Sequence, residues 1–320
     1  MKRRILKTGL CLSLIFSTMN INAKVHEING IIKNDYAQTK YPILFIHGMF
    51  GFSTLGVSKF GVDYWHQILP DLRRNGAQVF ASQISSLNTT EFRGEQALIQ
   101  LEEVLALSGS TKINVIGHSH GGPTARYLTG IIPDKLASVT SVGGTNFGSP
   151  VADLVEGTKP LNNVLAPLVN GIVSPLISFA QLVKNLPSDF KGSINSLTEA
   201  GSIKFNQKFP LGMTPTQSCT DGPSKQQGIY FYSWTGIANA TNILDPDTIL
   251  TALGPVAFDG QKNDGLVTVC SSKLGKTIRD DYDLNHFDEV NQILGLKSHN
   301  APDPVALYRQ HANRLKLEGL

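Results

Sequence analysis

Short apolar runs alternate with amphipathic stretches along most of the chain. Between these runs, residues 64–74 read as a helix, and residues 91–107 place apolar side chains at helical spacing, so that one face can pack on a sheet. This alternation predicts an α/β fold: a doubly wound, mostly parallel central sheet with helices on both faces. The expected strands cover residues 41–46, 77–82, 113–116, 137–142 and 229–234.

A long uncharged segment interrupts this pattern. No charged residue lies between Lys159 and Lys184, and the prolines and asparagines in between argue against a membrane-spanning helix. One interpretation is a buried core helix. We favour a mobile helical lid at about residues 150–190, whose apolar face covers a site in water and is exposed at a lipid surface.

The first 23 residues read as a secretory signal peptide. Four basic residues precede a short apolar run at residues 10–16, and Ala23 offers a cleavage site. The run is too short to span a bilayer, which disfavours a retained anchor. Removal of residues 1–23 takes four positive charges from the formal +3 and leaves the chain near −1. We therefore expect one secreted domain, residues 24–320, without the basic surface that nucleic-acid binding requires.

The cysteine count agrees with export. Cys11 lies within the signal peptide, so only Cys219 and Cys270 remain. In an oxidising compartment these two would most simply pair, although two buried free thiols are the alternative.

The motif Gly117-His118-Ser119-His120-Gly121 follows the apolar run at 113–116. A serine between two glycines at the end of a strand is typical of a nucleophile elbow, a strained strand-to-helix turn that exposes the hydroxyl. Pro123 suits the first turn of the helix that should follow. Ser119 is therefore the candidate nucleophile.

A serine nucleophile needs a base and an acid, and in hydrolases with this elbow both follow it in the chain. His286 is the preferred base because it lies in a polar loop after the last strand region and opens a stretch of amphipathic, helix-like spacing. His299 and His311 read as surface residues. Asp264, in a tight Asn-Asp-Gly turn, is the preferred acid, but spacing alone does not separate it from Asp259 or Asp247.

The oxyanion of an acyl-transfer intermediate needs two backbone donors. One should be the N–H of His120, just after the nucleophile, and the other the N–H of Met49 in the loop after the strand that ends at Ile46. The imidazoles of His47 and His118 are expected to bond nearby backbone and to take no part in the chemistry.

Taken together, these runs resemble those of the secreted bacterial true lipases of the Pseudomonas and Burkholderia type. The resemblance implies an α/β-hydrolase fold, hydrolysis of triacylglycerols and a triad of Ser119, Asp264 and His286, with Met49 and His120 as oxyanion donors. It extends over nearly the whole chain after the signal peptide, and its matching runs are residues 47–49, 61–65, 76–79, 93–96, 117–123, 263–267, 285–292 and 311–315.

The same resemblance implies a Cys219–Cys270 disulfide, a monomer and a membrane-bound lipase-specific foldase as maturation partner. It also implies one structural Ca²⁺, whose oxygen ligands would come from the side chains of Asp245, Asp288 and Gln292 and the backbone carbonyl of Leu296. Asp247 is a rival to Asp245. Two other functions stay open: an esterase for short soluble esters, and a binding protein with an idle site.

Overall fold

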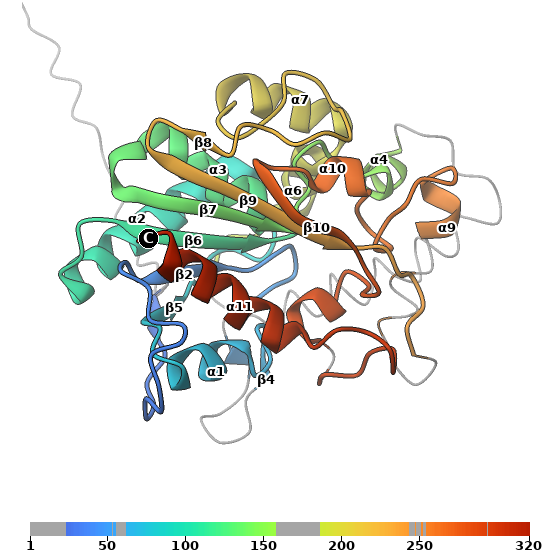
Figure 1. Cartoon of the computed structure of the whole chain (residues 1–320). Helices are drawn as coiled ribbons and strands as arrows, with labels where there is room; N and C mark the ends of the chain where they lie inside the picture. The colour runs from blue at the N-terminus through green and yellow to red at the C-terminus, as the bar shows by residue number, and fades with distance from the viewer. Residues whose placement is uncertain are drawn as a thin grey trace, which may run out of the picture.

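The computed structural model describes residues 24–52, 54–55, 62–157, 186–242, 247, 251, 254–292 and 294–320. Its centre is an eight-stranded sheet in the order β1-β5-β2-β6-β7-β9-β10, with β8 paired to β9 (Figure 1). β1 and β8 are antiparallel to their neighbours and the other pairs are parallel, which confirms the predicted sheet. The strands are β1 (His26–Glu27), β2 (Ile43–Ile46), β5 (Val79–Ala81), β6 (Ile113–His118), β7 (Leu136–Val142), β8 (Lys225–Gln226), β9 (Ile229–Gly236) and β10 (Lys276–Tyr282).

Helices cover both faces of the sheet, as the alternating sequence pattern requires. Leu44 and Ile46 point to one face, where they pack with α2 (Thr90–Ser108) and α3 (Gly121–Ile131). Ile43 and Phe45 point to the other, against α1 (Ile68–Arg74) and α11 (Pro304–Leu317). In Figure 1, α11 crosses the near side of the sheet and α2 and α3 lie behind it. Because β2 is buried on both sides, all four of its residues are apolar.

Further short elements lie outside the main sheet. Among the described residues no helix is both long enough and apolar enough to cross a membrane. The signal peptide at residues 1–23 and the central part of the proposed lid, residues 158–185, lie outside the described residues. The remaining elements are β3 (Thr54–Leu55), β4 (Val62–Asp63), η1 (Pro133–Lys135), α4 (Pro150–Glu156), α6 (Phe190–Leu197), α7 (Glu199–Lys208), α9 (Gly254–Ala257), α10 (Val269–Ser272) and η2 (Asp288–Val290).

One predicted element is wrong. The amphipathic spacing after His286 indicates a helix, but the structure forms only the three-residue 3-10 helix η2 there. The chain then leaves helical geometry, because Asn291 and Leu294 adopt left-handed backbone conformations with φ of 61° and 57°. Asp288, Gln292 and Leu296 therefore do not share one helical face.

Candidate active site

Ser119 occupies the sharp turn between β6 and α3, as the elbow motif predicts. Its φ is +56°, a strained conformation for a residue with a side chain. The flanking glycines are required by close backbone approach. A Cβ on Gly117 would lie 2.0 Å from the carbonyl oxygen of Gly121, and one on Gly121 would lie 2.2 Å from that of Ile46. The sequence thus lets the turn pass directly against the end of β2.

Asp264 and His286 are joined by two hydrogen bonds. The Asp264 Oδ2 atom lies 2.7 Å from His286 Nδ1, and the backbone N–H of His286 donates to the Asp264 carbonyl at 2.8 Å. The other carboxylate oxygen, Oδ1, accepts from the backbone N–H groups of Leu266 and Val267 at 2.9 and 2.7 Å. Both side chains are buried. With Nδ1 held by the carboxylate, a neutral ring presents Nε2 as its basic atom.

The structure brings this pair beside the elbow. The rings of His118 and His286 lie 4.6 Å apart between centroids, and His118 Nε2 donates to the His286 carbonyl at 2.9 Å. Because His118 directly precedes Ser119, the base candidate and the nucleophile candidate belong to adjoining segments.

The loop after β2 also passes against Ser119. A Cβ on Gly48 would lie 2.8 Å from the Ser119 Cβ, so only glycine fits this position. Met49 follows, and its side chain packs on Ala152 of α4 and its apolar neighbours in α6. His120 directly precedes the first residue of α3. Gly48, which precedes Met49, and His120 therefore both adjoin the serine.

A fully buried arginine holds the loop after β2. Arg93 donates from Nη2 to the His47 carbonyl at 2.5 Å, from Nη1 to the Ser85 carbonyl, and from Nε to Thr124 Oγ1 at 3.3 Å. Burial lowers the pKa of Arg93 to about 9. The role of Arg93 was not predicted from the sequence, although a charge among the apolar positions of a helix is a signal that could have identified it. The same face of α2 buries Ala97, Leu101 and Val104.

Three further histidines make buried structural contacts, and one of them corrects a prediction. His47 Nδ1 donates to the Gly48 carbonyl at 2.9 Å, and His120 Nε2 lies 2.8 Å from Thr90 Oγ1. His299 is exposed, as expected. His311, expected on the surface, is instead buried because its face of α11 packs on the sheet. Its Nε2 lies 2.9 Å from Thr140 Oγ1 of β7, and burial lowers its pKa well below the ordinary value.

A second carboxyl group, which was not predicted from the sequence, lies near His118 and Asp264. Glu289 is buried, and its Oε1 accepts from the Gly236 N–H at 2.6 Å and from Thr235 Oγ1 at 3.0 Å. Its Oε2 lies 3.5 Å from His118 Nε2. Burial, and the nearby Asp264 carboxylate, raise the pKa of Glu289 well above its ordinary value. Nothing in the residue pattern separated it from an ordinary surface acid.

Two of the carboxylates considered as calcium ligands meet at one asparagine. Asp247 Oδ1 accepts from Asn285 Nδ2 at 2.9 Å, and Asp288 Oδ2 accepts from the Asn285 N–H at 3.1 Å. Both aspartates are fully buried. Asn285 directly precedes His286, so these oxygens lie around the histidine loop.

The other expected calcium ligands, Gln292, Leu296 and Asp245, differ in how the structure describes them. Gln292 is buried, and its Nε2 donates to the backbone carbonyls of Asp63 and Tyr64 at 2.5 and 3.0 Å, so the amide oxygen is the atom left for an ion. Leu296 is 38% exposed. Asp245 lies outside the described residues. Carboxylate and amide oxygens at this loop match the donor chemistry of Ca²⁺.

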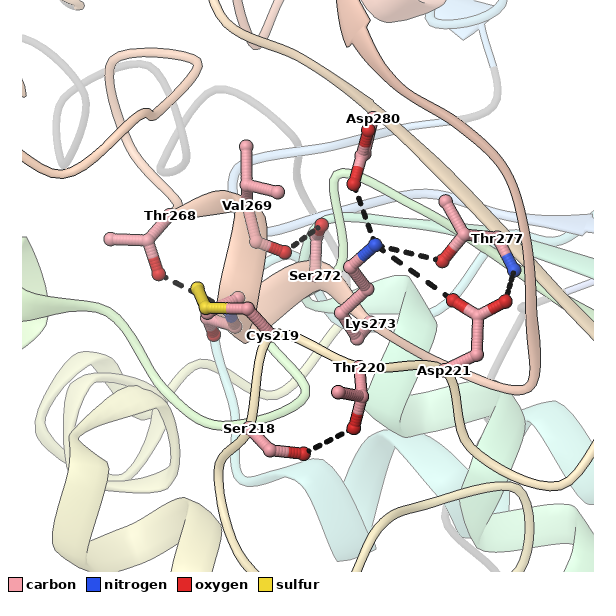
Figure 2. The surroundings of a disulfide bond; sticks show 12 residues. Ser218, Cys219, Thr220, Asp221, Thr268, Val269, Ser272, Lys273, Thr277 and Asp280 are labelled. Atoms are coloured by element: carbon pink, nitrogen blue, oxygen red, sulfur yellow. Dashed lines mark hydrogen bonds and ion pairs between the residues drawn. A yellow bond between two sulfur atoms is a disulfide. The ribbon is translucent and has the colours of Figure 1, made fainter.

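The predicted disulfide is present. Cys219 and Cys270 are bonded, with their Cα atoms 4.4 Å apart. Figure 2 shows Lys273, one turn beyond Cys270, reaching between Asp280 of β10 and Asp221 of the Cys219 segment. The Lys273 ammonium lies 2.6 and 3.8 Å from these carboxylates, and the lysine side chain is only 7% exposed. The covalent bond and this ionic cluster tie the same two segments together.

Comparison with known proteins agrees with this fold. Residues 41–166 match the alpha/beta hydrolase fold family. The chain is 47% identical to a triacylglycerol lipase of Vibrio cholerae, over 97% of this chain and 98% of that protein. It is 36% identical to a triacylglycerol lipase of Burkholderia plantarii, over 91% and 90%.

Solved structures support the fold independently. The mature form of the Bacillus licheniformis lipase BlEst2 superposes with a TM-score of 0.60 at 15% identity, covering 91% of this chain and 98% of the other. On the strength of the full-length relatives, the chain belongs to the triacylglycerol lipases of the α/β-hydrolase fold.

Proposed function

We propose that this lipase hydrolyses the ester bonds of long-chain acylglycerols through an acyl-enzyme on Ser119. The observation that carries the proposal is the Asp264–His286 pair. Two hydrogen bonds join these residues, and the pair adjoins the strained turn that holds Ser119. A serine hydroxyl is a weak nucleophile alone, and this pairing is the arrangement that activates it.

The proposed reaction has two balanced halves. The Ser119 Oγ attacks the ester carbonyl carbon while His286 Nε2 takes its proton, and the resulting oxyanion accepts hydrogen bonds from the Met49 and His120 N–H groups. Collapse breaks the ester C–O bond, and His286 returns the proton to the departing glycerol oxygen. His286 then deprotonates a water molecule, which attacks the carbonyl carbon of the acyl-serine. Collapse breaks the bond from this carbon to Ser119 Oγ, His286 returns the proton to Oγ, and the fatty acid leaves. The Asp264 carboxylate accepts the hydrogen bond from Nδ1 and holds the ring in the required tautomer.

A structural calcium ion would suit the histidine loop. We assign its ligands to Asp288, the Gln292 amide oxygen and the Leu296 carbonyl, with Asp245 or Asp247 as the second carboxylate. When bound, such an ion neutralises buried carboxylates and fixes the loop that carries His286. The ion takes no part in the proposed chemistry.

We also propose that residues of about 150–190 form a lid. This rests on the uncharged apolar sequence between Lys159 and Lys184. The described helices that flank its uncharged part, α4 and α6, pack together with Met49, the proposed oxyanion donor. An apolar cover at this position would favour substrates presented at a lipid–water interface.

We also propose that the protein is secreted. The N-terminal sequence of a signal peptide and the Cys219–Cys270 bond both favour a secreted protein. Maturation by a membrane-bound lipase-specific foldase follows from the family resemblance alone.

Titration of released fatty acid tests the substrate class. Emulsified triacylglycerols of graded acyl length should be hydrolysed, and the rate should rise when a partly soluble ester passes its solubility limit. An enzyme active only on dissolved short esters would instead be a carboxylesterase, and the lid assignment would fail with it.

A further inference from the structure

Tyr64, which was not predicted as a site residue, bridges two segments of the candidate active site. Its hydroxyl oxygen accepts the Gly48 N–H at 3.0 Å and lies 2.6 Å from His118 Nδ1. Gly48 precedes the expected oxyanion donor Met49, and His118 precedes Ser119. One phenol thus contacts the residue before each of these two positions.

The direction of these hydrogen bonds follows from their partners. A carbonyl can only accept, so His118 Nε2 carries the hydrogen that bonds the His286 carbonyl at 2.9 Å. Burial, and the adjacent His286 ring, lower the pKa of His118 well below its ordinary value, so the ring is neutral and holds a single N–H. His118 Nδ1 is therefore bare and must accept. The Tyr64 hydroxyl then donates to Nδ1 while it accepts from Gly48.

We propose that Tyr64 and His118 are positioning residues that form a one-way hydrogen-bond relay from the oxyanion loop to the catalytic histidine. The relay runs from the Gly48 N–H through the Tyr64 O–H and the His118 ring to the His286 carbonyl. It rests on the function proposed above, because it sets the spacing of the groups assigned to that reaction.

Such a relay matters because the proposed oxyanion donor, nucleophile and base come from separate segments of the chain. Gly48 follows β2, His118 ends β6 and His286 follows β10. A change in one loop would otherwise shift donor, nucleophile and base independently, and small misplacements of reacting groups are costly. Consecutive hydrogen bonds also polarise one another, which favours one fixed arrangement of the chain. Neither residue is proposed to touch substrate.

The first test removes only the hydroxyl. Tyr64→Phe should lower kcat on a soluble p-nitrophenyl ester by about tenfold, the effect expected of one hydrogen bond, with KM within about twofold. Tyr308→Phe is the matched control. Tyr308 is buried and, like the partly buried Tyr64, packs against Trp65, but its hydroxyl makes no hydrogen bond to any described residue. This control should keep the wild-type kcat.

The second test places both residues in one chain of contacts. His118→Gln retains an N–H that can reach the His286 carbonyl and should keep more activity than His118→Leu. Because Tyr64 acts through His118, adding Tyr64→Phe to His118→Leu should cause no further loss of kcat. In the wild-type protein, ¹⁵N resonances of labelled His118 should show a bare Nδ1 and a protonated Nε2.

The outcomes separate this inference from the proposed function. A folded Tyr64→Phe enzyme with the activity of Tyr308→Phe, losses that add in the double variant, or an Nδ1-protonated ring would each overturn the relay. The tautomer measurement needs no variant to fold. A wild-type enzyme that hydrolyses no ester would instead refute the proposed function, whatever the variants do.

Discussion

The Asp264 carboxylate and the His286 ring meet at 2.7 Å, and the same two residues are joined again through their backbones at 2.8 Å. The side-chain contact can orient the imidazole, and the backbone contact holds its loop to the turn that carries the acid. Orientation and support of the base therefore come from one residue.

This arrangement predicts the effect of an isosteric change at Asp264. Asp264→Asn keeps an Oδ1 acceptor for the N–H groups of Leu266 and Val267, so the turn should fold, but it removes the charge that favours the required tautomer. We expect kcat to fall by roughly 10³- to 10⁴-fold. The control is Asp259→Asn at an exposed acid upstream, which should be fully active. Equal activity of the two variants in a standard esterase assay would reassign the acid.

Acid should destabilise the fold through its buried imidazoles. Burial lowers the pKa of His47 to about 3 and that of His311 well below its ordinary value. The unfolded chain binds protons at these groups from about pH 6.5 downward, whereas the native chain does not. Stability therefore falls as pH drops through that range. Glu289, whose pKa is raised, opposes this trend as a single group.

Denaturant unfolding at several pH values measures this linkage. Each such histidine adds up to about 1.4 kcal/mol per pH unit to the slope of the unfolding free energy. His311→Gln removes one of them, so its slope below about pH 6 should be shallower than that of the wild type. Identical slopes for the two proteins would contradict the assignment of His311 as a buried neutral ring.

Loss of the disulfide should affect stability more than chemistry. The bond closes a loop with a sequence separation of 51, for which chain entropy predicts at most ~4 kcal/mol. The Lys273–Asp221 contact joins the same two segments, and the Lys273–Asp280 contact ties Lys273 to β10. The double variant Cys219→Ser, Cys270→Ser should therefore melt at lower temperature yet keep its kcat at 25 °C. Adding Lys273→Met should lower the melting temperature further, and no additional loss would argue against a shared role.

The calcium assignment predicts a chelator response that depends on Asp288. With calcium at 100 times its Kd, binding stabilises the fold by about 2.7 kcal/mol. A chelator should lower the melting temperature of the wild type and leave Asp288→Asn unaffected. Asp283→Asn, at an exposed acid of the same loop, should respond like the wild type. A wild-type protein with the same melting temperature with and without chelator would contradict the calcium assignment.

The sheet and the elbow were predictable because their determinants are local. Short apolar runs identify β2 and β6. The glycines around Ser119 are needed where backbone segments approach too closely for any larger residue. The Asp264–His286 contact was not fixed in this way, since it joins residues 22 positions apart through the fold. Spacing alone left Asp259 and Asp247 as alternatives.

The errors have a common physical origin. The sequence of α11 is polar on average, so the pattern did not indicate the face on which His311 is buried. The amphipathic stretch after His286 ends at residues with left-handed backbone conformations, which hydrophobic spacing does not predict. Arg93 and Tyr64 act through partners distant in sequence, so no local pattern assigns their contacts.

The assignment of Ser119 as the nucleophile is tested by mass-spectrometric mapping of the protein after reaction with an active-serine phosphonate. We expect one adduct per chain, on Ser119, formed in parallel with loss of triacylglycerol hydrolysis, and none in Ser119→Ala. An adduct at another serine, or hydrolysis of triacylglycerol by the Ser119→Ala protein, would contradict it.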